Sequence, residues 1–145
     1  IKLLEKFLEL STKTNKPVII HNREATGDLI NALKKYKTKG IIHCFNGSKE
    51  TANIFLKLGY KLGIGGVITF KNCKLKEEIK GFSPNSFLLE TDAPYLTPEP
   101  YRGKPNEPKY MIYTLRALSE ALNINEEELS NTLENNFHEL FDNNN

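Results

Sequence analysis

Helical and strand patterns alternate strictly along this sequence, and that alternation is the strongest constraint on its fold. Apolar residues recur at helical spacing in one segment and form a short β-branched run in the next. Strict alternation with continuously apolar strands is typical of parallel sheets joined by right-handed helical crossovers. The sequence therefore predicts an α/β fold with about four parallel strands and flanking helices.

The predicted elements follow one another with short connections. Strands are expected at residues 18–21, 40–45, 60–67 and 86–91. Helices are expected at residues 1–14, 25–36, 48–58, 74–80, 109–122 and 125–141, with a proline-rich loop at 93–108. Four strands in 145 residues match half of a (β/α)8 barrel, which takes about 250 residues. A small open four-stranded α/β sheet is the alternative.

Length and composition predict a single packed domain, residues 1–145. The chain is 39% hydrophobic and 26% charged with a net charge of +2, which argues against a disordered chain and a strongly basic nucleic-acid binder but allows local basic patches. No apolar stretch approaches the roughly 18 residues of a membrane span, so we expect no membrane association. Cys44 and Cys73 are too few for a disulfide scaffold, and they indicate a cytoplasmic protein.

Three predicted strands end in side chains that bind metal ions. The first ends at His21, the second ends at His43, and the fourth runs into Asp92. Because the carboxyl ends of parallel strands lie on one face, we expect these side chains to converge. Imidazole and carboxylate ligands suit Zn, Mn or Fe, and such ions activate bound water as a nucleophile. The alternatives are hydrogen-bonded structural histidines and an aspartate that caps a turn.

Two charged residues beside these positions are candidate substrate-binding residues. Glu90 lies two residues before Asp92, so an extended strand points both carboxylates to the same side. Glu90 could orient substrate or a ligand, or it could pair with a lysine. Arg23 follows His21 by two residues and could hold a phosphate through its planar guanidinium, or it could pair with Glu24.

A glycine-rich stretch ends the third predicted strand. Gly63, Gly65 and Gly66 do not have the G-x-G-x-x-G spacing of a dinucleotide-binding loop. We interpret them as positions of close approach near the mouth of the site, or as a bulge.

The proline-rich loop interleaves aromatic and basic residues directly after Asp92. Tyr95, Tyr101, Arg102 and Lys104 could stack a nucleobase and hold backbone phosphates, although they could also simply pack the loop. A loop of this length inside a compact domain is usually functional, and we favour a binding role.

Several segments resemble the TatD family of metal-dependent deoxyribonucleases, in order and in spacing. They are residues 17–23 (PVIIHNR), 42–47 (IHCFNG), 90–96 (ETDAPYL), 101–108 (YRGKPNEP) and 135–137 (NNF). The resemblance implies a (β/α)8 TIM barrel of the amidohydrolase type with one or two divalent metal ions, such as Zn, Mg or Mn. It also implies hydrolysis of phosphodiester bonds in a DNA substrate by a metal-activated water.

On this resemblance His21, His43 and Asp92 are metal ligands, and Asp92 is also the catalytic base. The residue patterns add Arg23, Glu90, Tyr95 and Arg102 as substrate-binding residues. Two alternatives remain: a metal-dependent hydrolase of a small ester, amide or amine, and a non-catalytic barrel fragment that associates with a partner half.

The sequence lacks two features of the family, the H-x-H pair of the first strand and the metal-bridging glutamate of a middle strand. It also opens at Ile1, not Met, directly in a helical pattern. We therefore expect an incomplete barrel that lacks its N-terminal strands. Exposed barrel edges would favour self-association.

Overall fold

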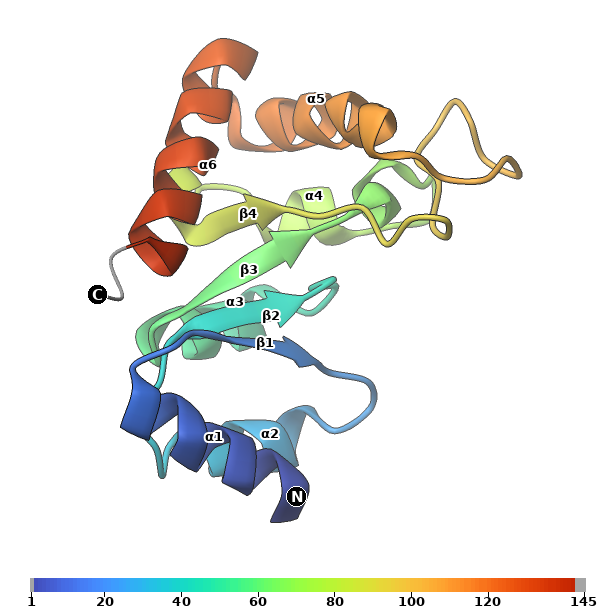
Figure 1. Cartoon of the computed structure of the whole chain (residues 1–145). Coiled ribbons are helices and arrows are strands. Elements are labelled where there is room, and N and C mark those ends of the chain that lie inside the picture. Colours follow the sequence, from blue (N-terminus) through green and yellow to red (C-terminus); the bar gives the residue numbers. More distant parts are fainter. Residues whose placement is uncertain (1, 143–145) are drawn as a thin grey trace.

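Four parallel strands form the centre of the fold, in the spatial order β1-β2-β3-β4 (Figure 1). The structure is a computed structural model and describes residues 2–142. The strands are β1 (Val18–His21), β2 (Gly40–His43), β3 (Tyr60–Ile64) and β4 (Phe87–Leu89). The register places His21 directly opposite His43 at the carboxyl ends of β1 and β2. The predicted parallel α/β architecture is confirmed.

Helices separate the strands, as the alternating pattern predicts. The α-helices are α1 (Lys2–Thr14), α2 (Thr26–Leu33), α3 (Lys49–Lys57), α4 (Leu75–Glu78), α5 (Met111–Leu122) and α6 (Glu126–Phe141). Short 3₁₀ helices are η1 (Gly66–Thr69), η2 (Pro84–Ser86) and η3 (Pro108–Tyr110). The first residue of the predicted helix 1–14 lies outside the described residues.

The third strand is shorter than predicted. The sequence predicts a strand over residues 60–67, but β3 ends at Ile64 and the chain turns into η1. The proline-rich loop packs directly on this turn: a Cβ on Gly66 would lie 2.3 Å from the Leu96 carbonyl oxygen. The backbone amide of Glu99 donates to Thr69 Oγ1 at 2.9 Å. Contacts with this distant loop end the strand, and local sequence does not reveal them.

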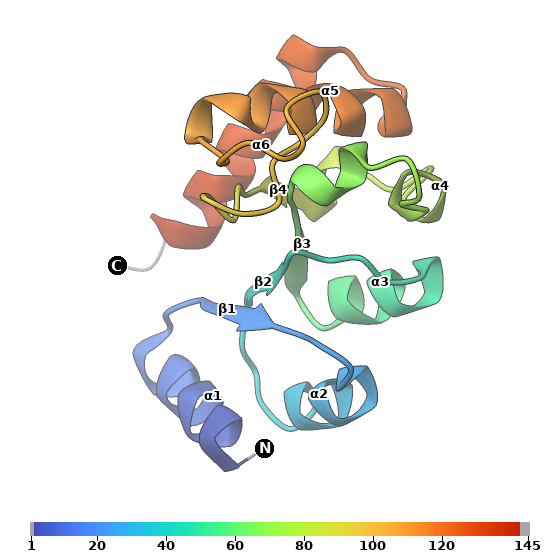
Figure 2. The same ribbon diagram turned by 90° about the vertical axis from the view of Figure 1, so that its right-hand side faces the viewer.

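The sheet has two different faces. Buried side chains of one face, including Ile42, Leu62 and Phe87, belong to the main core, and Figure 2 shows α2, α3 and α4 on one side of the sheet. On the opposite face Ile41 and Leu88 form a small second cluster with Leu140 of α6. The main core packs the first face of the sheet against helices. On the second face, α6 covers only part of the sheet.

The β1 edge of the sheet is open within residues 2–142, because β1 pairs only with β2. An apolar groove of about 620 Å³ runs between this strand and α1, and Leu3, Phe7 and Ile19 in it are exposed. Self-association through this edge stays a prediction, as does a cytoplasmic location. No helix within residues 2–142 is long and apolar enough to cross a membrane.

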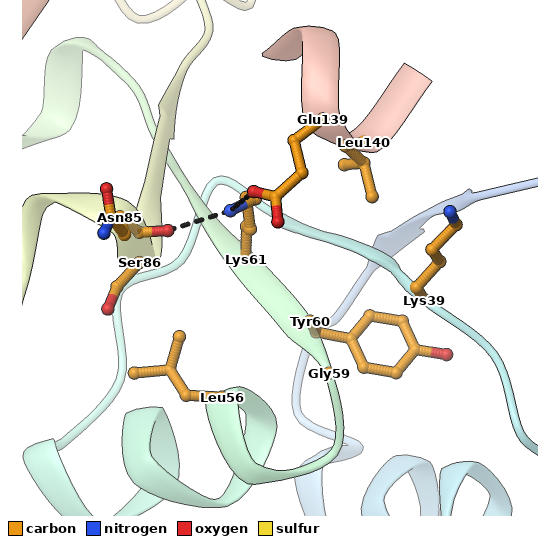
Figure 3. A pocket seen from close by; sticks show the side chains of 9 residues that line it. All are labelled: Lys39, Leu56, Gly59, Tyr60, Lys61, Asn85, Ser86, Glu139 and Leu140. Atoms are coloured by element: carbon orange, nitrogen blue, oxygen red, sulfur yellow. Dashed lines mark hydrogen bonds and ion pairs between the residues drawn. The ribbon is translucent and has the colours of Figure 1, made fainter. Parts of the chain in front are cut away.

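Side chains of α6 and β3 secure the amino-terminal end of the sheet. The side-chain amide of Asn136, which is 3% exposed, donates to the carbonyl oxygens of Pro84 at 3.0 Å and Phe87 at 2.9 Å. Beside it, Lys61 Nζ donates to the Asn85 carbonyl at 2.9 Å and pairs with Glu139 at 3.1 Å, at the edge of a cavity of about 390 Å³ (Figure 3). These contacts tie the last helix to the start of β4.

Replacing Asn136 by alanine tests this anchor. The Asn136→Ala variant removes both hydrogen bonds, although the Pro84 carbonyl still accepts from the Phe87 N–H, and we expect it to lower the free energy of unfolding by about 1–3 kcal/mol. Urea denaturation monitored by circular dichroism measures the change. Asn135→Ala is the matched control, because the neighbouring Asn135 is exposed on the same helix. Equal urea midpoints for the two variants would show that the anchor contributes nothing.

Candidate functional site

His43 lies between two carboxylates at the carboxyl end of the sheet. Its Nδ1 lies 2.7 Å from Glu90 Oε2, and its Nε2 lies 2.9 Å from Asp92 Oδ1. The three side chains are partly buried, with 25%, 18% and 23% of their surfaces exposed for His43, Glu90 and Asp92. Contacts at both ring nitrogens fix the orientation of the imidazole. We call these three residues the His43 cluster.

Backbone conformation positions the cluster. Cys44 and Asp92 have φ angles of +48° and +56°, left-handed values that are uncommon for residues other than glycine. The turn at Cys44 aims its backbone N–H at Glu90, which accepts this hydrogen bond through its second oxygen. Both carboxylate oxygens of Glu90 are thus engaged, one by His43 and the other by Cys44.

A glycine in β3 makes room for this contact. β3 lies between the strands that carry His43 and Glu90, and a Cβ on Gly63 would lie 2.5 Å from Glu90 Oε1. Any larger residue at this position would push the carboxylate away from the imidazole. The interpretation of Gly63 as a position of close approach is confirmed.

Burial and hydrogen bonding have opposite effects on the pKa values of His43 and Glu90. Burial opposes the charge on His43, but the hydrogen bonds and negative charges of Glu90 and Asp92 outweigh it and raise the pKa of His43. Burial raises the pKa of Glu90, although the Cys44 amide and His43 act in the opposite direction. Burial, followed by the nearby carboxylates, raises the pKa of the Cys44 thiol to about 12. The pKa shifts of His43 and Glu90 therefore both favour their protonated forms, and the Cys44 thiol is neutral.

The chemistry of these side chains fits a metal ion. Histidine ligands commonly donate their second ring nitrogen to a carboxylate, as His43 can to Glu90. His21 brings a second imidazole, whose ring centroid lies 5.9 Å from that of His43. Within residues 2–142, however, no three His, Cys, Asp or Glu side chains are arranged to hold an ion by themselves. The metal-binding role of His21, His43 and Asp92 stays a prediction.

Three of the four predicted substrate-binding residues lie outside the His43 cluster. Arg23 is exposed, and within residues 2–142 it forms no ion pair with Glu24. The Tyr95 side chain is 75% exposed. Arg102 stacks 3.9 Å from the Phe70 ring centroid and donates to the Thr97 carbonyl at 3.4 Å. Only Glu90, of the four predicted substrate-binding residues, touches His43.

Asn106 fixes the start of the proline-rich loop beside the cluster. Its side-chain amide donates to the carbonyl oxygens of Thr91 at 2.6 Å and Tyr95 at 2.7 Å. Its backbone amide donates to the Pro94 carbonyl at 2.9 Å. A single buried side chain therefore holds the backbone on both sides of Asp92.

The hydrogen bond from the Cys44 backbone amide to Glu90 could not be predicted from the sequence, because every residue except proline has the same backbone donor. Tyr110 and Tyr113, which pack against Tyr101 of the loop, could not be predicted either. Their three-residue spacing is that of any helix face, so no sequence signal distinguishes them.

Comparison with known proteins decides the family of the chain. The family model described as TatD related DNase matches residues 1–142. The chain belongs to the TatD family. It is 41% identical to the uncharacterized metal-dependent hydrolase YabD of Bacillus subtilis, over 92% of this chain and 54% of that protein. It is 34% identical to the uncharacterized metal-dependent hydrolase YcfH of Escherichia coli, over 92% of this chain and 52% of that protein.

Solved structures share this fold. The crystal structure of YjjV, a TatD homolog from Escherichia coli, superposes with a TM-score of 0.89 at 35% identity, over 97% of this chain and 55% of that one. An uncharacterized amidohydrolase from Saccharomyces cerevisiae superposes with a TM-score of 0.83 at 18% identity, over 94% of this chain and 58% of that one, a likeness of fold alone. The chain spans about half the length of the TatD relatives it matches.

Substitution of Gly63 tests the packing of the cluster. Gly63→Ala places a methyl group against Glu90, and we expect a loss of about 1–3 kcal/mol in the free energy of unfolding. The control is Gly27→Ala: Gly27 lies in α2 with no atom within 4 Å of an added Cβ, so alanine there should stabilise the helix by up to about 1 kcal/mol. Urea denaturation measures the free energy of unfolding of both variants. A change in the same direction for Gly63→Ala and Gly27→Ala would contradict this account.

Proposed function

We propose that this TatD-family chain carries part of the active site of a deoxyribonuclease that hydrolyses phosphodiester bonds in DNA with the help of one or two divalent metal ions. The observation that carries the proposal is the His43 cluster at the carboxyl ends of the strands. In α/β barrels this end of the sheet is where catalytic groups gather. The relatives described as metal-dependent hydrolases support the metal requirement.

The residues of the proposed site have three kinds of role: holding the metal, orienting a ligand and accepting a proton. His21, His43 and Asp92 would hold the metal, which supplies Lewis acidity toward a phosphate oxygen and lowers the pKa of bound water. With its proton on Nδ1 donated to Glu90, His43 would offer Nε2, which lies 2.9 Å from Asp92 Oδ1, to the metal. Asp92 accepts a proton from the attacking water through its carboxylate. The Cys44 amide holds Glu90 in place.

The exposed groups beside the cluster suit a polymeric anion. Arg23 leaves its guanidinium available at the loop after β1, where it would bind a phosphate in a planar, bidentate manner. The open ring of Tyr95 is suited to stacking on a nucleobase. Arg102, held against Phe70, adds positive charge to the same loop. Together these groups favour DNA over a small ester or amide.

Cleavage of a fluorescently labelled DNA oligonucleotide in Zn²⁺, Mn²⁺ or Mg²⁺ tests the proposal. Asp92→Asn keeps the size of the side chain but removes its charge and basicity, and we expect cleavage to fall by at least about 100-fold. Removal of metal with EDTA should abolish cleavage, and restored metal should recover it.

Asp142→Asn is the control, because Asp142 lies at the end of α6 beside His138 and far along the chain from the cluster. It should cleave DNA as the unsubstituted chain does. Cleavage that survives EDTA or the Asp92→Asn change would remove the proposed site. Turnover of a small carboxylic ester without turnover of DNA would assign the site to the other substrate class.

A further inference from the structure

Three tyrosines from different parts of the chain pack into one cluster. Tyr101 comes from the proline-rich loop, Tyr110 ends η3, and Tyr113 lies in the first turn of α5. The rings of Tyr101 and Tyr110 stack at 4.5 Å with an interplanar angle of 15°. Tyr113 meets Tyr101 edge-on at 5.4 Å and lies 6.4 Å from Tyr110. We call these residues the tyrosine cluster.

A cation lies over each ring of the cluster. Lys104 Nζ is 5.4 Å from the Tyr101 centroid, and Lys109 Nζ is 5.2 Å from that of Tyr110. The guanidinium of Arg116 is 5.7 Å from the Tyr113 centroid. The rings are only partly buried, and the three cationic residues are exposed. The cluster is therefore an aromatic surface bordered by positive charge.

Carboxylates meet two of these cations in weak, exposed pairs. Glu107 lies 2.8 Å from Lys109, and Glu126 lies 3.5 Å from Arg116. About half or more of every side chain in these two pairs is exposed, so a phosphate can replace the carboxylate at little cost. Within residues 2–142 Lys104 has no carboxylate partner.

The cluster lies on the same end of the sheet as the His43 cluster. The loop that carries Tyr101 starts directly after Asp92, and Asn106 fastens it to the backbone of Thr91 and Tyr95. Figure 1 shows this loop and the start of α5 beyond the arrowheads of β3 and β4. A strand of nucleic acid held there can run along the loop toward Asp92.

We propose that the tyrosine cluster and its cations, Lys104, Lys109 and Arg116, form a binding subsite for single-stranded DNA that leads to the His43 cluster. Nucleobases stack on the tyrosine rings, and backbone phosphates bind the three cations. Aromatic rings interleaved with cations are the two components of single-strand binding surfaces. The inference deepens the proposed function and rests on it for the choice of DNA.

Binding measured without catalysis tests the subsite. Fluorescence anisotropy in EDTA compares a 15-nucleotide thymidine strand with an abasic strand of the same length. We expect Tyr101→Leu to weaken binding of the thymidine strand by about tenfold, the loss of one stacked base, and to leave abasic binding unchanged. Tyr101→Phe keeps the ring and should bind as the unsubstituted chain does, which separates stacking from loss of the hydroxyl.

A matched pair of lysines tests the phosphate contacts. Lys109 is 65% exposed and pairs with Glu107, while Lys80 is 66% exposed and pairs with Glu77 in a different part of the chain. Lys109→Ala should weaken the binding of both the thymidine strand and the abasic strand. It should also lower the slope of log affinity against log salt concentration by about 0.7. Lys80→Ala should leave affinity and slope unchanged. Circular dichroism spectra confirm that each variant is folded.

The outcomes separate this inference from the proposed function. Thymidine binding within twofold of the unsubstituted chain in folded Tyr101→Leu would overturn the subsite, as would equal effects of Lys109→Ala and Lys80→Ala. Failure of the unsubstituted chain to bind either strand would overturn it as well. Tyrosine-dependent binding without metal-dependent cleavage would retain the subsite and remove the nuclease assignment. Cleavage that needs Asp92 but not Tyr101 would retain the nuclease assignment and remove the subsite.

Discussion

The candidate site depends on one side-chain contact that crosses the middle of the sheet. His43 ends β2 and Glu90 follows β4, so their 2.7 Å contact passes over the intervening strand β3. It forms because Gly63 has no side chain at the crossing point. The left-handed turn at Cys44 supplies a second donor to Glu90 from the same side. The space over β3 and the turn after β2 therefore set the position of both polar groups that face Asp92.

The two ends of the strands serve different purposes. At the amino-terminal end, Asn136 saturates backbone carbonyls around β4, and Lys61 joins β3 to α6. At the carboxyl-terminal end His43, Glu90 and Asp92 contact one another, and the side chains of Arg23 and Tyr95 are exposed. This division is common in parallel α/β folds, where stability is concentrated at one end and chemistry at the other. Changes at the amino-terminal end can therefore adjust stability without touching the reacting groups.

Much of the fold and part of the site could be predicted from the sequence. The parallel topology alone requires His21, His43 and Asp92 to share one end of the sheet, because each lies at or just after the carboxyl end of a short apolar strand. The early end of β3 could not be predicted, since the distant loop at Leu96 forces it. The tyrosine cluster escapes prediction for a related reason. Tyr110 and Tyr113 have the three-residue spacing of any helix face, and only the folded loop brings Tyr101 onto them.

The contact between His43 and Glu90 joins residues 47 positions apart, and this separation ties the site to the cooperativity of the whole sheet. No short peptide cut from the chain could reproduce the imidazole–carboxylate pair. A local opening that frees β4 from β3 would separate Glu90 and Asp92 from His43 while leaving most of the helices intact. The imidazole–carboxylate pair therefore forms only when β2, β3 and β4 are paired in one sheet.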